Sequence, residues 1–162
     1  MYTIQKHLQF NAWANGKIVE ILANVDEKFF DQEVKSSFPT IRKTVLHVWD
    51  AEIIWLTRLQ GGDASIWPSS NFTGGKTELL EGFSNSSKKL VEFISGKDRA
   101  FLDSTISYKN LKGLEFTSIT EEILFHVVNH GSFHRGQLIT MLRELGFDKF
   151  PAEDLIAYLR QL

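Results

Sequence analysis

The chain has 162 residues, of which 43% are hydrophobic and 23% charged, and its formal net charge is -2. This balance is typical of a folded protein and excludes the basic field that binding to a phosphate backbone needs. With no cysteine, the chain excludes disulfides, thiolate metal sites and a cysteine nucleophile. No apolar run approaches the roughly 20 residues that span a bilayer, and the N-terminus lacks the apolar core of a signal peptide. We therefore expect one cytoplasmic domain over residues 1–162, with no membrane or nucleic-acid partner.

The first part of the chain predicts three long helices. Apolar residues recur with a spacing near 3.6 over residues 2–25, which indicates an amphipathic first helix. Residues 40–60 are apolar on most sides, as in a helix buried between others, and the pair Gly61-Gly62 ends this second helix. After a loop, the third helix is predicted over residues 77–95.

The second part of the chain predicts a hairpin and a fourth helix. Residues 100–118 contain β-branched and aromatic residues that favour a short hairpin or an irregular crossover. Ser118 and Glu121 match a capping box, so the fourth helix should begin there and continue to Leu145. A short last helix is predicted over residues 152–162. The sum is an all-α fold, a four-helix bundle with a short C-terminal helix and a small hairpin in the long crossover between helices three and four.

Histidines recur on the predicted fourth helix, in the segment HVVNHGSFHRGQL that begins at His126 and includes His130 and His134. Each step of four residues advances about 6 Å along a helix and about 40° around it, so all three side chains point into one sector. His126 and His134 are about 12 Å apart along the axis, so only neighbouring pairs can chelate one ion. The apolar stripe of this helix passes through His134 and has His130 at its edge.

A shared cation would satisfy two imidazoles at these inward positions, and an unsatisfied buried polar group costs roughly 1–3 kcal/mol. We therefore favour His130 and His134 as a metal-binding pair. The alternative is two ordinary histidines with hydrogen-bond partners of their own, which the spacing alone does not exclude.

The third ligand is predicted to come from another helix. His47 lies in TVLHVWDAEIIWL, the most hydrophobic segment, where an unpartnered imidazole is least favourable; His7, His126 and a carboxylate are the alternatives. Three imidazoles around a divalent cation leave coordination positions open, which is the pattern of catalytic sites, and imidazole does not select one metal. Asp50, one turn after His47, is predicted as a partner of its other ring nitrogen or as a base.

Other residues near these histidines have two interpretations each. Asp50 and Glu52 could instead pair with Arg58 or Arg135. Gln137 lies on the side of His130 and is predicted to bind a ligand, whereas Arg135 should point away and form a structural salt bridge. Trp13 is predicted to contact substrate, and Trp49 and Trp67 are further candidates; for all three tryptophans the alternative is packing in the core.

The chain resembles the DinB family of metal-binding helical proteins, which is akin to bacterial thiol transferases of the YfiT and bacillithiol-transferase type. The resemblance runs from end to end and is carried by FNAWAN (residues 10–15), LHVWDAEIIWLTRLQG (46–61) and NHGSFHRGQL (129–138). It implies an up-down-down-up bundle with metal ligands at His47, His130 and His134. It also implies a divalent ion, with zinc or nickel expected first and iron or others as alternatives.

The resemblance implies a function as a metal-dependent transferase that activates a low-molecular-weight thiol, such as bacillithiol, mycothiol or glutathione, for transfer to a small electrophile. Two alternatives remain open. One is a metal-dependent hydrolase that uses Asp50 or Glu52 as its base, and the other is a non-catalytic, stress-associated metal-binding protein. The residues do not decide the oligomeric state, although proteins of this kind commonly form homodimers.

Overall fold

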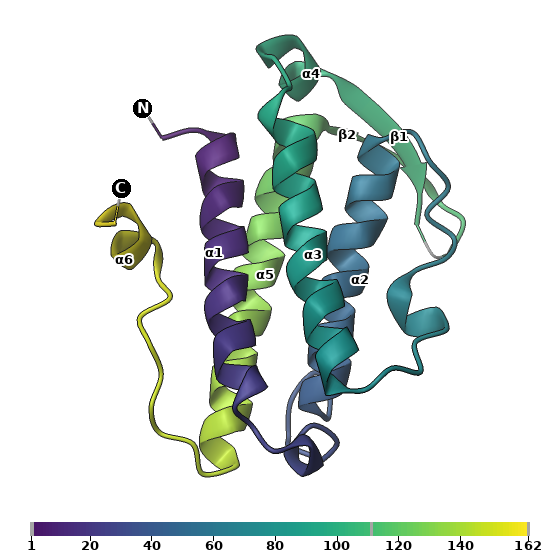
Figure 1. Ribbon diagram of the computed structural model, residues 1–162. Helices are drawn as coiled ribbons and strands as arrows, with labels where there is room; N and C mark the ends of the chain where they lie inside the picture. The colour runs from purple at the N-terminus through teal and green to yellow at the C-terminus, as the bar shows by residue number, and fades with distance from the viewer. Residues whose placement is uncertain (1, 111, 162) are drawn as a thin grey trace.

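The computed structural model describes residues 2–110 and 112–161 of the chain (Figure 1). In this part of the chain four long helices form the bundle. Helices α1 and α5 descend in the view of Figure 1, whereas α2 and α3 ascend, so the order is up-down-down-up. Both α1 and α2 pack against α3 and α5. The predicted all-α four-helix bundle is therefore confirmed, and its long helices are α1 (Ile4–Ala23), α2 (Ile41–Leu59), α3 (Lys76–Ser95) and α5 (Thr120–Glu144).

The first two helices begin at threonine caps. The side chain of Thr3 accepts a hydrogen bond from Lys6 N, and that of Thr40 accepts one from Lys43 N. These oxygens satisfy amides that have no partner inside the helix. Because α2 and α3 run in the same direction, the residues between them must return along the length of the bundle. A short 3-10 helix, η2 (Pro68–Ser70), interrupts this return.

The predicted hairpin is confirmed between the third and fourth long helices. A short helix α4 (Arg99–Asp103) leads into strand β1 (Thr105–Lys109), which pairs with the antiparallel strand β2 (Glu115–Ile119). The predicted capping box was wrong. Ser118 belongs to β2, and its hydroxyl contacts the Tyr108 hydroxyl at 3.2 Å, while Glu121 pairs with Arg99. Strand pairing extends to Ile119 and holds this backbone away from capping geometry.

The C-terminal segment forms a shorter helix than predicted. Helix α6 spans Leu155–Leu159 and begins where the Asp154 carboxylate accepts a hydrogen bond from Ala157 N. Leu162, the predicted end of this helix, lies outside the described residues. No helix in the described ranges is both long enough and apolar enough to cross a membrane.

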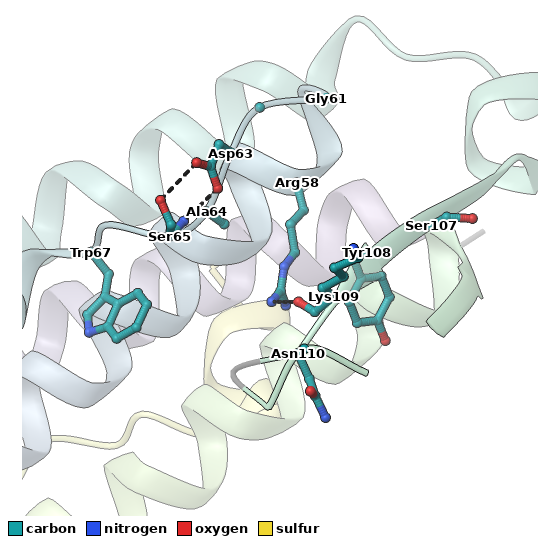
Figure 2. Close-up of a pocket in the computed structure, with 12 residues that line it drawn as sticks. Arg58, Gly61, Asp63, Ala64, Ser65, Trp67, Ser107, Tyr108, Lys109 and Asn110 are labelled. Carbon is teal, nitrogen blue, oxygen red and sulfur yellow. Dashed lines mark hydrogen bonds between the residues drawn. The ribbon is translucent and has the colours of Figure 1, made fainter. Parts of the chain in front are cut away.

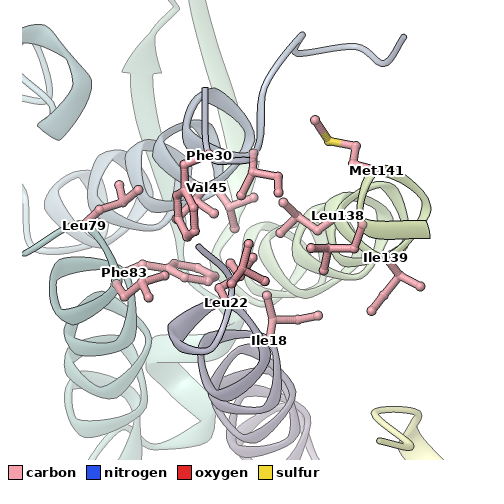
Figure 3. Packing of buried hydrophobic residues seen from close by; sticks show 14 of the residues in the cluster. Ile18, Leu22, Phe30, Val45, Leu79, Phe83, Leu138, Ile139 and Met141 are labelled. Atoms are coloured by element: carbon pink, nitrogen blue, oxygen red, sulfur yellow. The ribbon is translucent and has the colours of Figure 1, made fainter. Parts of the chain in front are cut away.

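Buried hydrophobic residues gather in two clusters, one at each end of the bundle (Figure 3 shows the lower one). Each of the four long helices contributes residues to both clusters, and between them each helix carries buried polar residues. Together these residues form a polar layer across the bundle. Asn11, Asn15, Glu52 and Arg135 are at most 3% exposed. The side-chain amides of both asparagines donate to Glu52 Oε1, and their oxygens accept from Arg135 Nη1. On α3, Ser86 and Ser87 donate to the same Glu52 carboxylate.

Candidate metal centre

Three imidazoles converge where α2 and α5 face each other. The ring centroid of His47 lies 4.8 Å from that of His130 and 4.7 Å from that of His134. The centroids of His130 and His134 are 4.4 Å apart. One ring nitrogen from each histidine lies within 4.8 Å of the others, so the group could hold a metal ion. The structure thus brings together the three side chains that the sequence predicted as ligands.

The donor atoms have a spacing compatible with one shared cation. The Nε2 atoms of His47 and His130 are 2.9 Å apart. Nitrogen ligands of a tetrahedral zinc ion are separated by about 3.3 Å, given bonds of about 2.0–2.1 Å. Small side-chain rotations would therefore bring the imidazoles to ligand distances. The donor set, three nitrogens and no carboxylate or sulfur, fits zinc, nickel, iron or copper alike.

The two more exposed imidazoles are held in the neutral form that a metal requires. Burial lowers the pKa of His47 to about 4, and the neighbouring His134 lowers it further. Burial lowers the pKa of His130 to about 3, with added repulsion from His134, His47 and His126. At neutral pH both rings therefore carry a free lone pair on nitrogen, as metal binding requires.

Gln137 fixes the orientation of His134. Its Oε1 accepts a hydrogen bond from His134 Nδ1 at 2.8 Å, and its Nε2 donates to Ser37 Oγ at 2.8 Å. Because an amide oxygen can only accept, Nδ1 carries the hydrogen and Nε2 of His134 keeps its lone pair. The sequence predicted Gln137 to bind a ligand. In the structure its amide bonds to the buried imidazole, and the binding of a ligand by Gln137 stays a prediction.

Two aromatic residues that the sequence did not reveal contact the histidines, Phe38 from the loop before α2 and Phe133 from α5. The Phe38 ring stacks on His47 with centroids 4.2 Å apart, and the exposed Phe133 ring meets His134 edge-on at 5.0 Å. A cavity of about 510 Å³ is lined by Phe133 and Gln137, which contact His134, and by Ser37, but the three histidines are not among its lining residues. In the sequence, Pro39 beside Phe38 indicates the start of a helix, but no pattern there predicts a contact between Phe38 and a histidine.

Several other predicted site residues have different partners. The Asp50 carboxylate accepts a hydrogen bond from Ser69 N at 2.8 Å, in the η2 segment, and so its predicted contact with His47 is not formed in the structure. Burial raises its pKa, and the bonds to Ser69 oppose that rise. Trp13 packs against Phe10 and Tyr158 in the upper core cluster, as expected if this tryptophan has a role in core packing.

Three further residues that the sequence singled out, Trp49, Arg135 and His126, lie outside the three-histidine cluster. Trp49 contacts Phe72 and lies against Gly82 of α3, where an added Cβ would come within 2.2 Å of the indole. Arg135 points into the polar layer and lies 3.4 Å from Glu153, so its predicted structural role is confirmed. His126 is exposed beside the cluster, with its ring 5.9 Å from that of His130.

The low pKa values of the cluster predict that the metal-free protein is sensitive to acid. In the folded chain the pKa values of His47 and His130 lie below 6.5, the value of an unfolded histidine. Above pH 6.5 both rings are neutral in the folded and the unfolded chain, so their burial carries no protonation penalty and the folded state has its full stability. Part of this stability is lost as the pH falls toward the folded-state pKa. We expect the melting temperature of metal-free protein to fall between about pH 6.5 and pH 4, and to fall less in a His47→Gln/His130→Gln variant. Identical pH profiles of thermal unfolding would contradict this.

Comparison with known proteins places the chain in a family. The family model described as the DinB family matches residues 1–160. Protein DinB of Bacillus subtilis (strain 168) is 28% identical over 155 residues, covering 91% of this chain and 89% of that protein. A crystal structure of a DinB-like protein from Bacillus subtilis matches with a TM-score of 0.69 and 17% identity, covering 94% of this chain and 99% of the other.

Two further structures share the fold. YfiT from Bacillus subtilis, described as a probable metal-dependent hydrolase with an unusual four-helix bundle topology, matches with a TM-score of 0.66 and 14% identity, covering 90% of this chain and 89% of YfiT. A mutant of mycothiol-dependent maleylpyruvate isomerase matches with a TM-score of 0.65 and 13% identity, covering 85% of this chain and 61% of that one. Since the family match spans almost the whole sequence, the chain belongs to the DinB family.

Proposed function

We propose that this protein is a divalent-metal enzyme that activates a low-molecular-weight thiol for transfer to a small electrophile. The observation that carries the proposal is the convergence of three imidazoles, with ring nitrogens within 4.8 Å of one another. Two side chains in contact with His134, Phe133 and Gln137, also line a cavity. A fold shared with a mycothiol-dependent enzyme supports a thiol as the co-substrate. Zinc or nickel is the proposed ion, as the resemblance to the DinB family implies, and the three nitrogen donors suit either metal.

The chain's own residues have distinct roles in this proposal. His47, His130 and His134 would hold the ion, which when bound supplies a positive charge that favours the thiolate form of a thiol. Gln137 keeps the His134 ring in one tautomer through its hydrogen bond to Nδ1. The rings of Phe38 and Phe133 pack against His47 and His134 and give the site an apolar border. The cavity beside Ser37 offers room for the electrophile.

Hydrolysis is the second candidate, because YfiT is described as a probable metal-dependent hydrolase. Hydrolysis needs a base close to the ion. Both carboxylates that the sequence offered have other partners, since Asp50 is bonded to Ser69 and Glu52 is enclosed in the polar layer. The contacts of these two carboxylates therefore favour thiol transfer, in which the nucleophile arrives with the co-substrate.

The test is turnover of an electrophile such as monochlorobimane with bacillithiol, mycothiol and glutathione in turn. We expect zinc- or nickel-loaded protein to accelerate the reaction with at least one thiol, and His134→Ala to remove the acceleration. A His126→Ala variant is the matched control, because His126 lies on the same helix outside the cluster. Equal rates for wild type and His134→Ala would reject thiol transfer. Metal-dependent ester hydrolysis without any thiol would favour the second candidate.

A further inference from the structure

A larger cavity, of about 590 Å³, lies away from the histidines (Figure 2). It is enclosed by the loop that leaves α2, residues 61–67, and by the β1–β2 hairpin. Arg58 in this cavity is eleven positions after His47 on α2, which corresponds to about 16 Å along the helix axis. The volume is in the range of small-molecule pockets. This cavity is therefore a separate place where a ligand could bind.

Arg58 is held rigidly at this cavity. Its guanidinium carbon lies 4.7 Å from the ring centroid of Trp55 and 4.8 Å from that of Tyr108. One of its nitrogens, Nη2, donates a hydrogen bond to Lys109 O at 2.8 Å, and Figure 2 shows the side chain reaching from α2 toward the hairpin. Stacking on aromatic rings fixes the plane of a guanidinium and leaves N–H groups at its edge available to an acceptor.

No carboxylate neutralises Arg58 among the described residues, whereas other arginines such as Arg42 and Arg99 form ion pairs. The carboxylate in the same cavity, Asp63, accepts hydrogen bonds from the amide and hydroxyl of Ser65. Lys109, the other cation at the cavity, is 3.4 Å from Glu115. Burial lowers the pKa of Arg58, as expected for a cation partly removed from water without a compensating anion.

We propose that this cavity binds a small carboxylate, whose oxygens accept hydrogen bonds from the edge of the Arg58 guanidinium. A planar carboxylate matches two parallel N–H groups of arginine, which gives both energy and orientation. The rings of Trp67 and Tyr108 form apolar walls beside this group. Gly61 has open space where a side chain would be, so a ligand can approach the loop backbone. The proposal is independent of the metal and of thiol transfer.

The test is a calorimetric titration of the protein with succinate and, separately, with inorganic phosphate. We expect saturable binding of succinate that is at least about tenfold weaker in Arg58→Gln, since a hydrogen bond to a charged group is lost. Arg143→Gln is the matched control, because Arg143 also lies over an aromatic ring, 5.2 Å from the Phe150 centroid, but outside this cavity. Its affinity for succinate should equal that of wild type.

A second variant separates ligand binding from any structural role of Arg58. Ala64→Phe would fill the cavity while leaving the Arg58 contacts with the hairpin in place, and it should abolish succinate binding. Thermal unfolding would show that both variants are folded. Undiminished binding in either variant, no binding by wild type, or tighter binding of phosphate than of succinate would each overturn the proposal.

Discussion

Replacing His130 by alanine is expected to lower the affinity for zinc or nickel by more than about a hundredfold, beyond the 10–100-fold typical of residues that only support a ligand. The reason is geometric. The three rings form a nearly equilateral triangle, with His130 4.8 Å from His47 and 4.4 Å from His134, so the loss of His130 leaves two nitrogens on different helices. The measurement is competition against a chromogenic chelator, together with elemental analysis of protein purified without an affinity tag.

Two variants make this prediction selective. His126→Ala should keep a full metal equivalent, because His126 is exposed outside the three-imidazole group. Gln137→Leu should give an intermediate loss of about 10–100-fold, because the ligand remains and only the partner of its Nδ1 is removed. A full equivalent of metal in His130→Ala would show that the imidazole cluster is not the binding site.

Substituting Arg135 by methionine is expected to reduce the free energy of unfolding by about 3–5 kcal/mol, the range observed when one member of a buried charge pair is removed. Arg135 is 3% exposed and donates to the side-chain oxygens of Asn11 and Asn15. The amides of these asparagines in turn donate to Glu52. Without the guanidinium, both asparagine oxygens lose their partner, and the Glu153 and Glu52 carboxylates lose a nearby positive charge.

Urea unfolding monitored by circular dichroism measures this loss. Arg143→Met, an exposed position on the same helix, should stay within about 0.5 kcal/mol of wild type. A double variant, Arg135→Met with Glu52→Met, should be less destabilised than the sum of the single variants, because both charges leave together. A loss below about 1 kcal/mol in Arg135→Met would mean that the polar layer contributes little to stability.

The same polar layer connects the fold to the metal site. Arg135 follows His134 directly on α5 and bonds to α1, so the layer fixes the rotation of α5 that directs His130 and His134 toward α2. Gly131 allows this close approach, since a Cβ there would come within 2.6 Å of Asn11 Oδ1. The three segments that carry the family resemblance, residues 10–15, 46–61 and 129–138, contain the three histidines and four members of the polar layer, Asn11, Asn15, Glu52 and Arg135.

The sequence by itself determined the helical elements and the histidine pair of the candidate metal site. Helical periodicity depends on neighbours three and four residues away, so it located the long helices to within a few residues and placed His130 and His134 on the inward stripe of α5. The hydrophobic environment of His47 was also visible, because a histidine among apolar residues must find a polar partner inside the fold.

Only the tertiary structure decided the contacts between segments that are distant in the chain. Pairing of β2 through Ile119 overrode the capping box at Ser118, and the return loop gave Asp50 a partner in Ser69 rather than His47. The stacking of Phe38 on His47 likewise depends on how the loop before α2 folds back over the helix. Each of these contacts joins groups whose separation is set by the packing of the bundle, and local propensity contains no information about that distance.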